Sequence, residues 1–270
     1  RGARVMPVFL HDGGVHVFHH IPKAAGTTVE TWLQARFGVI GLYDPRHRDR
    51  PAFQRWSRTS PQHLLFEDFE RLFPSALIAS SFAVCRHPVE RAISAYRNAL
   101  TRGYLPRGPS LEDWLRHVLS NQDRYPYAFD NHLRPQKQFV GEDTIVFRLE
   151  DGMDAVFDWL ENKFGDPATP IERVSANRAW TEQSDMQRVR LPPSSLRWMR
   201  DVYAADFERF GYDLDPDAEY FYLRAPRDVG LRGWLREGRY RGQVTLRQAI
   251  GRTERAIPRL RYWAASGEWG

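Results

Sequence analysis

Hydrophobic positions along the chain fall into short runs that alternate with helical patterns. Val15–His19 is rich in β-branched and aromatic residues, which predicts a short buried strand. Ser80–Arg86 and Thr144–Leu149 have the same character and predict two further strands. Because these strands alternate with helical segments, the pattern predicts an α/β fold with a central parallel sheet and helices on both of its faces.

Helical spacing follows the first predicted strand. Val29, Trp32, Leu33 and Phe37 recur at intervals that give one helix an apolar face toward the sheet. Arg46–Arg58 is polar and arginine-rich, and it predicts a loop. Similar reasoning predicts further helices at Glu67–Leu72, Val89–Leu100, Leu111–Leu119, Asn131–Phe139, Met153–Phe164 and Ser194–Phe210.

The composition is that of one main domain with an appendage. A chain of 270 residues with 42% hydrophobic content can bury a sizeable core, and no Gly/Ser- or Pro-rich linker divides it near the middle. Between Arg224 and Arg261 there are eleven arginines against three acidic residues. We therefore predict a main domain over residues 1–214 and a basic, aromatic-containing helical extension over 215–270. A solvated tail is the favoured interpretation of the extension, and a surface for an anionic acceptor, a membrane or a partner subunit is the alternative.

Charge and cysteine content narrow the class of partner. The net charge of +5 and a pI near 9.5 suit an anionic ligand. Nucleic acid is not expected, because RNP-like aromatics, C2H2 spacing and a basic region with heptads are all missing from the sequence. The single Cys85 excludes an internal disulfide and a multi-cysteine zinc site.

Localisation is predicted from the same features. A lone cysteine is compatible with a reducing compartment. The sequence contains no run of about 18 apolar residues, so no transmembrane segment is predicted. A cytoplasmic protein is therefore expected. The sequence starts at Arg1 rather than Met, so an upstream anchor or signal that has been removed is the alternative.

The first constellation of functional residues follows the first strand. A strand that ends in a small-residue turn and starts a helix presents free backbone N–H groups and the positive end of a helix dipole to an anion. Ala24, Ala25 and Gly26 leave the backbone accessible, Thr27 and its neighbour Thr28 add hydroxyl donors, and Lys23 adds a mobile charge after Pro22. The lysine precedes the glycine, and Gly-Lys-Ser/Thr does not occur, which disfavours a magnesium-dependent ATPase loop. An ordinary strand–helix turn with a chance lysine is the structural alternative.

The second constellation follows the next strand. Arg86 stands at the strand terminus, where ligands of parallel sheets collect. Arg91 and Ser94 are three residues apart on the predicted helix that starts at Pro88, so they share a face. An arginine fork with a serine hydroxyl is a suitable receptor for a phosphate. A salt-bridged corner between strand and helix is the alternative interpretation.

Both constellations resemble one known family. His-Ile-Pro-Lys-Ala-Ala-Gly-Thr-Thr at residues 20–28 is similar to the 5′-phosphosulfate motif of carbohydrate-type sulfotransferases. The string with Arg86, Pro88, Arg91, Ser94 and Tyr96 resembles their 3′-phosphate motif, although His87 stands where the family usually has Asp or Asn. The resemblance, which spans roughly residues 15–212, implies a three-layer P-loop-like fold.

The resemblance also implies an activity, transfer of a sulfonate group from 3′-phosphoadenosine 5′-phosphosulfate (PAPS) to a hydroxyl, without a metal. Residues 22–28 would bind the 5′-phosphosulfate, and Arg86 and Ser94 would bind the 3′-phosphate. Arg178, in a loop that closes over the nucleotide in the family, would join them. Glu150, after the third strand, resembles a family feature near the nucleotide, and a residue at a helix N-terminus is its alternative.

Sulfonate transfer needs a group to stabilise the departing oxygen and a base to take the acceptor's proton. Lys23 suits the first task. Histidine is the natural base near neutral pH, and His63, in a Pro-Gln-His string similar to related bacterial enzymes, is the first candidate. His132 is the second, in a segment with Arg134 that resembles one lining the cleft of the family, and His20 is expected to support the phosphosulfate turn and contact substrate. The structural alternative for His63 is a histidine that caps a helix or lies on the surface.

The acceptor is predicted only as a class. Nine tryptophans and many arginines would suit a carbohydrate with acidic groups, because aromatic faces stack on sugar rings and arginines pair with carboxylates. A lipid, a small alcohol or a tyrosine hydroxyl stays open, as does the oligomeric state. Two other functions compete, a magnesium-dependent nucleotide kinase-like phosphotransferase and a non-catalytic nucleotide-binding module.

Overall fold

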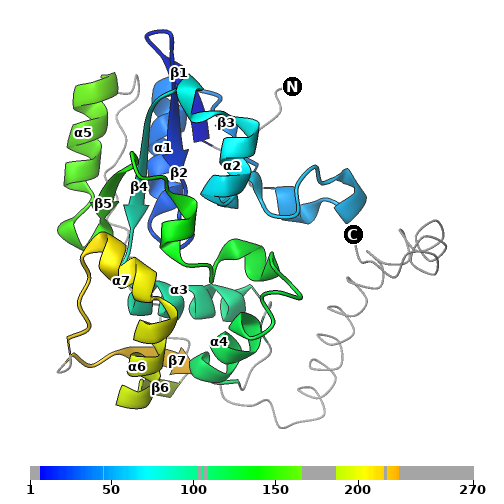
Figure 1. Ribbon diagram of the computed structural model, residues 1–270, viewed down its shortest axis with the longest axis vertical. Coiled ribbons are helices and arrows are strands. Elements are labelled where there is room, and N and C mark those ends of the chain that lie inside the picture. The colour runs from blue at the N-terminus through cyan, green and yellow to red at the C-terminus, as the bar shows by residue number, and fades with distance from the viewer. Residues whose placement is uncertain are drawn as a thin grey trace.

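A five-stranded sheet forms the centre of the protein. The computed structural model describes residues 7–44, 46–102, 105, 109–165, 187–215 and 218–224. The sheet order is β3-β1-β2-β4-β5 (Figure 1). The strands are β1 (Pro7–His11), β2 (Gly14–His19), β3 (Gly41–Leu42), β4 (Ile78–Cys85) and β5 (Ile145–Arg148).

The sheet is mixed, so the prediction of a parallel sheet is wrong for its outer part. β2, β4 and β5 run parallel, whereas β1 is antiparallel to both β2 and β3. The reason is a two-residue hairpin between β1 and β2, in which Asp12 and Gly13 have φ of 47° and 76°. Asp-Gly is a favoured pair for such a turn because both positions need a positive φ.

Helices cover both faces of the sheet. α1 (Gly26–Phe37) and α5 (Asp154–Phe164) lie on one face, where Phe18 and Phe82 join their apolar residues in one core cluster. α2 (Phe66–Leu72) covers part of the opposite face through Phe69, which packs against Val17. Because side chains alternate along a strand, successive residues of β2 and β4 contribute to the cores on opposite faces of the sheet.

A mainly helical layer lies beyond the carboxyl ends of β2, β4 and β5 (Figure 1). It contains α3 (Pro88–Thr101), α4 (Leu111–Leu119), α6 (Pro193–Val202), α7 (Ala204–Phe210) and the antiparallel pair β6 (Gln187–Arg190) and β7 (Phe221–Arg224). The single helix predicted over Ser194–Phe210 is divided at Tyr203, whose φ and ψ of −105° and 23° are not helical.

The segment predicted as a helix over Asn131–Phe139 is not one. It holds two short 3-10 turns, η5 (Ala128–Asn131) and η6 (Gln136–Phe139), on either side of Pro135. Proline has no N–H to donate, and it disfavours helical geometry in the residue before it, so a continuous helix cannot pass through this position.

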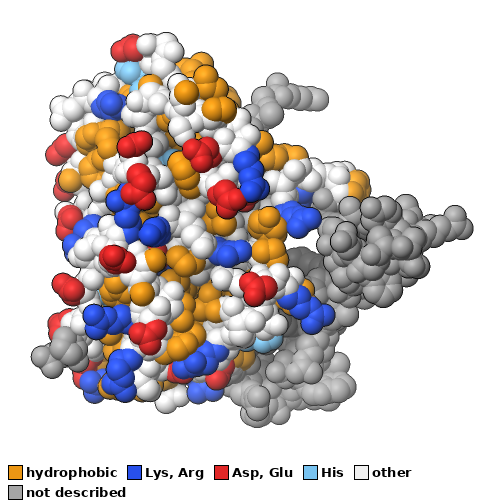
Figure 2. Space-filling model, in the orientation of Figure 1, with side chains coloured by type: hydrophobic (Ala, Val, Ile, Leu, Met, Phe, Trp, Pro, Cys, Tyr) orange, Lys and Arg blue, Asp and Glu red, His pale blue; other side chains and the backbone are white. Residues whose placement is uncertain are grey.

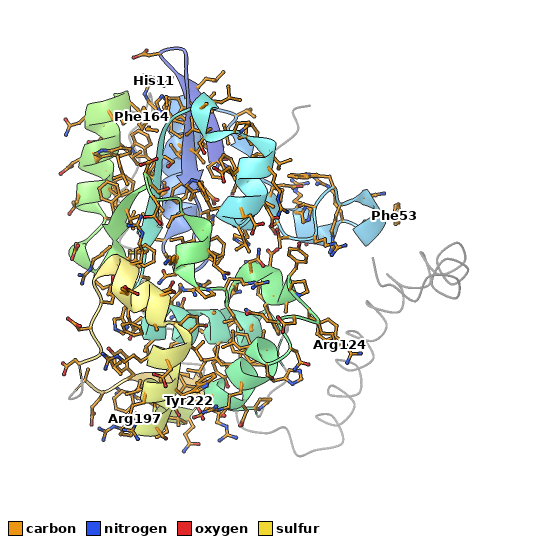
Figure 3. The ribbon with its side chains drawn as sticks, viewed as in Figure 1. His11, Phe53, Arg124, Phe164, Arg197 and Tyr222 are labelled. Atoms are coloured by element: carbon orange, nitrogen blue, oxygen red, sulfur yellow. The ribbon has the colours of Figure 1, made fainter. Side chains whose placement is uncertain are left out.

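The arginine-rich segment predicted as a loop extends away from the sheet. It contains the short 3-10 turns η1 (His47–Asp49) and η2 (Ala52–Gln54). Phe53 lies at its outer end with 63% of its surface exposed (Figure 3). Elsewhere, the face in Figure 2 shows acidic and basic side chains interspersed. No helix among the described residues has the length and hydropathy needed to cross a membrane.

Candidate active site

The two predicted constellations lie at the same edge of the sheet. β2 ends at His19, four residues before Lys23, and β4 ends at Cys85, directly before Arg86. Because the two strands are parallel neighbours, their carboxyl ends bring both segments together. This edge is where open α/β sheets collect their ligands.

The turn between β2 and α1 has an unusual backbone. Lys23 and Ala25 have φ of 71° and 61°, in the left-handed region, and Ala25 is the N-cap of α1. The Thr28 N–H donates to the Ala25 carbonyl at 2.9 Å, which closes the first helical turn. The amides of the first helical residues, Gly26 and Thr27, have no earlier helical carbonyl to bind, and they are the groups that a helix N-terminus offers to an anion.

Gly26 is required by the side chain that covers it. A Cβ at this position would overlap with the ring of His20, and its closest atom would be Nε2. The His20 ring crosses Gly26 and reaches Glu30, one helical turn further on, where Nδ1 lies 2.5 Å from the carboxylate oxygen. Both side chains are buried, so the turn between β2 and α1 is attached to a buried histidine–carboxylate pair.

Lys23 lies in a concentration of positive charge. Burial, together with the nearby charges of Arg97, Arg102 and Arg86, lowers the pKa of Lys23 to about 8. Repulsion among these cations is relieved when an anion with several charges binds among them. The electrostatics therefore fit a ligand that carries several negative charges.

Arg86 is held through its backbone. Its N–H donates to Gln136 Oε1 at 2.9 Å, and its carbonyl accepts from Gln136 Nε2 at 2.7 Å. Gln136 is fully buried, and its own N–H donates to the buried Asp206. The Arg86 guanidinium contacts Glu90 at 3.1 Å, with 21% of the side chain exposed, so it can still reach a ligand.

The other two residues of the second constellation, Arg91 and Ser94 on α3, have different surroundings. Ser94 is 6% exposed and lies three residues after Arg91, on the same side of the helix. Arg91 is 1% exposed and donates to the carbonyls of His132 and Arg134 at 2.8 and 2.6 Å. Arg91 therefore links the helix of the second constellation to the segment that carries His132.

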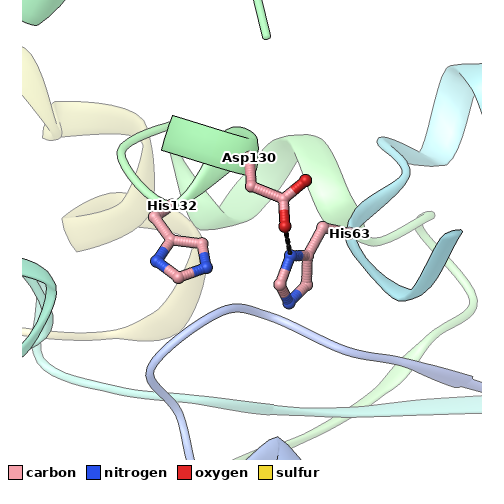
Figure 4. Close-up of side chains that lie close together, drawn as sticks. All are labelled: His63, Asp130 and His132. Atoms are coloured by element: carbon pink, nitrogen blue, oxygen red, sulfur yellow. Dashed lines mark hydrogen bonds and ion pairs between the residues drawn. The ribbon is translucent and has the colours of Figure 1, made fainter. Parts of the chain in front are cut away.

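His63 forms a second histidine–carboxylate pair, with Asp130. Its Nδ1 lies 2.9 Å from the carboxylate, as Figure 4 shows. The same carboxylate accepts from the Ser60 N–H and hydroxyl, both at 2.6 Å. An imidazole that donates from Nδ1 to a carboxylate keeps Nε2 as a proton acceptor. Burial lowers the pKa of His63, against the opposing effect of Asp130, so the ring is neutral at neutral pH.

The backbone beneath Asp130 is strained. Phe129, Asp130 and Asn131 have φ of 51°, 60° and 62°, three successive non-glycine residues in the left-handed region. Such conformations concentrate at functional sites and persist where the surrounding structure fixes them. Here the Asn131 side chain donates to the His63 carbonyl at 2.8 Å, which connects the strained segment to the histidine that Asp130 orients.

Three histidine rings lie in a row. The rings of His20 and His63 are 4.9 Å apart and nearly perpendicular, and those of His63 and His132 are 5.0 Å apart. Ring nitrogens of His63 and His132 and an oxygen of Asp130 lie within 4.8 Å of one another, a set that could hold a metal ion. The sequence did not indicate this set, because His63 lies 67 residues before Asp130 and its neighbour His132.

Comparison with known proteins identifies the family. A model of the sulfotransferase family matches residues 8–213, which is most of the chain. The chain belongs to the sulfotransferase family. Searches of curated proteins and of solved structures found no match.

The sulfotransferase match ends before the basic C-terminal segment. The other residues that the sequence predicts for the site differ in their surroundings. Arg134 donates from Nε and Nη2 to the Pro126 carbonyl at 3.2 and 2.9 Å. Glu150 accepts from the His87 N–H and from the Tyr212 hydroxyl, each at 2.7 Å, so it ties the end of β4 to the last helical layer. Arg178 and nearly all of the extension lie outside the described residues.

The sequence did not single out two carboxylates of this sulfotransferase site. Asp130 is separated from His63 by 67 residues, and Glu30 looks like a polar residue of an amphipathic helix. Asp130 was visible only as a neighbour of His132 in the Asp-Asn-His string. Glu30 is four residues after Gly26, the spacing of one helical turn, which was the one available sign that both face the same side.

Proposed function

We propose that this sulfotransferase moves a sulfonate group from PAPS to a hydroxyl of an acceptor, by in-line displacement that needs no metal. The observation that carries the proposal is the contact of the first constellation, through His20, with a candidate base. His20 covers Gly26 of the phosphosulfate turn, and its ring meets that of His63 at 4.9 Å. An anion site with a charged lysine therefore lies beside a neutral, carboxylate-oriented imidazole.

The donor would be bound by residues on the two strand ends. The turn over Pro22, Ala24, Ala25 and residues 26–28 would hold the 5′-phosphosulfate with its amides and hydroxyls, which is the P-loop-like part of the fold. Arg86 and Ser94 would hold the 3′-phosphate, and Arg178 would add to them. The concentration of positive charge around Lys23 supports this assignment.

The residues divide the chemistry between them. His63 Nε2 would take the acceptor's proton as its oxygen forms a bond to sulfur, with Asp130 stabilising the resulting imidazolium. Lys23 would stabilise the phosphate oxygen from which sulfur departs. His132 lies on the other side of His63 and is the alternative base. His20, His132 and Arg134 are proposed to border the acceptor.

A carbohydrate is the acceptor class that we propose. Trp56 and Phe53 are exposed on the arginine-rich segment that leads into His63, with 51% and 63% of their surfaces accessible. Exposed aromatic faces can stack on sugar rings, and arginines pair with their acidic groups. This surface supports the proposal because it belongs to the same segment as the proposed base.

The experiment that tests the donor is calorimetric titration with adenosine 3′,5′-bisphosphate (PAP), against AMP and against ATP with magnesium. Selective binding of PAP is expected, with its loss in Arg86→Ala. Arg71→Ala, which removes an exposed arginine of α2, is the matched control and should bind like the wild type. Preference for ATP with magnesium would favour a kinase, and PAP binding without any transfer would favour a non-catalytic module.

A further inference from the structure

A second buried histidine–carboxylate pair lies beside the proposed base. Glu30 is 2% exposed, and its carboxylate lies 2.5 Å from His20 Nδ1. A buried carboxylate is unfavourable unless it is paired, so this pair defines a fixed orientation for the imidazole. The function proposed above assigns no task to Glu30.

The His20 ring is confined on several sides. It crosses Gly26, where any side chain would displace it, and it stacks on Phe18 with ring centroids 5.9 Å apart. The His63 ring also lies beside it, at 4.9 Å and an interplanar angle of 89°. The position of His20 therefore determines one side of the space that His63 can occupy.

His63 is thereby held from two directions. Asp130 fixes the Nδ1 edge of its ring through a hydrogen bond, and the perpendicular His20 ring limits rotation about the bond from Cβ to the ring. A base must keep its lone pair within hydrogen-bond reach of the proton that it removes. A change in the orientation of His20 would move Nε2 of His63 relative to the phosphosulfate turn.

We propose that Glu30 is a positioning residue of the transfer reaction, which fixes the His20 ring between the phosphosulfate turn and the His63 base. This inference rests on the proposed function for its catalytic part. Its structural part, the coupling from Glu30 through His20 to His63, can be measured on the free protein. Glu30 also lies close enough to influence His63 electrostatically, since its charge raises the pKa of that ring.

The test uses Glu30→Gln, His20→Asn and the double variant. Glutamine keeps the size of Glu30 but removes its charge, and asparagine can place an amide near the position of His20 Nδ1 while the Nε2 edge is lost. Thermal unfolding of each variant monitors the fold. The two single changes and their combination form a cycle that isolates action of Glu30 through His20.

The first readout is the ¹⁵N NMR spectrum of the histidine rings, recorded with and without PAP. Glu30→Gln is expected to shift the ring signals of both His20 and His63, and to shift those of His63 much less when His20 is already asparagine, because only the direct electrostatic effect of Glu30 then remains. Unchanged His63 signals in the single variant would overturn the proposal. This readout needs no turnover, so it decides the coupling even if the protein fails to bind PAP and the proposed function falls.

The second readout is PAPS consumption with pooled heparosan, unsulfated chondroitin and hyaluronan as acceptor probes, or water alone. Glu30→Gln is expected to lower kcat about tenfold and to leave the Kd for PAP near that of the wild type. No further loss is expected when Glu30→Gln is added to His20→Asn. An unchanged kcat, or equal losses in both backgrounds, would overturn the positioning role while PAP binding by the wild type would leave the proposed function standing.

Discussion

In the proposed function, Lys23 is the residue whose ionisation bears most directly on donor binding. Its pKa of about 8 results from burial and from three nearby arginines, so the amine loses its proton in the mildly alkaline range. An anion that binds beside it favours the charged form. Donor binding and protonation of Lys23 are therefore linked.

This linkage predicts the direction in which PAP affinity changes with pH. PAP affinity should fall as the pH rises from 7 to 9, because deprotonation of Lys23 removes a positive charge from the site. Lys23→Ala should bind PAP more weakly at pH 7 and lack this step, and its kcat should fall by orders of magnitude, roughly 10²-fold or more. Titrations across this pH range measure the first two effects, and a wild-type slope in the variant would contradict the assignment.

His63 should control the acid side of the pH profile. The base must be neutral to act, and burial lowers its pKa, so activity should decline only below the ordinary histidine value of about 6.5. His63→Ala should abolish transfer with PAP affinity nearly unchanged. If that variant stays active and His132→Ala is inactive, the base is His132.

Asp130→Asn should have two separable effects. Loss of the carboxylate's charge removes an influence that raises the pKa of His63, so the acid limb should move to lower pH. The plateau should fall by about 10²–10⁴-fold, because the imidazole is no longer held with Nε2 free. Rates measured from pH 5 to 8 distinguish the two, and a plateau equal to that of the wild type would show that Asp130 is not needed.

At the scale of elements, the start of α1 depends on the absence of a side chain at Gly26. Gly26→Ala would place a Cβ inside the volume of the His20 ring, so either the ring or the helix must shift. The unfolding free energy should fall by about 1–3 kcal/mol, a typical cost of overpacking. Thr27→Ala, at the exposed next position, is the control and should be close to wild type in chemical denaturation. A stable Gly26→Ala protein would mean that the turn is looser than described.

The strands and helices that carry the site could be predicted from local sequence patterns, whereas the side chains that contact the site residues across the fold could not. Strand β4 and the helix after Pro88 follow from an apolar run and a proline at a first turn, which are local signals. The alternation of strands and helices does not predict the β1–β2 hairpin, although Asp12-Gly13 is a strong turn signal. Pro135 was likewise visible inside the segment wrongly predicted as a helix.

Long-range partners have no such local signal. Asp206 caps the amides of Gln136 and Lys137 from 70 and 69 residues away, and nothing in its own surroundings along the chain indicates that it is fully buried. The same is true of the carboxylates that orient His63 and His20. Sequence motifs locate groups that touch a ligand, whereas the groups that hold them in place depend on the packing of the whole fold.

At the scale of the whole molecule, the site lies where the sheet meets the helical layer, so a ligand there contacts both. PAP at one hundred times its Kd should raise the unfolding free energy by about 2.7 kcal/mol, because it binds only the folded protein. Thermal unfolding with PAP, and with ATP and magnesium at equal concentration, measures this effect. Arg86→Ala should show no stabilisation, and equal stabilisation by both nucleotides would contradict a site for the 3′-phosphate.

The left-handed run at Phe129, Asp130 and Asn131 has a consequence for attempts to engineer this enzyme. Each such residue costs about 1–2 kcal/mol relative to ordinary backbone, and Phe129 lacks the short polar side chain that makes this conformation tolerable. A directed-evolution campaign that rewards heat resistance alone should therefore accumulate substitutions here, with glycine at Phe129 among the first. Such variants would gain melting temperature and lose turnover, a trade-off located in one turn of the chain.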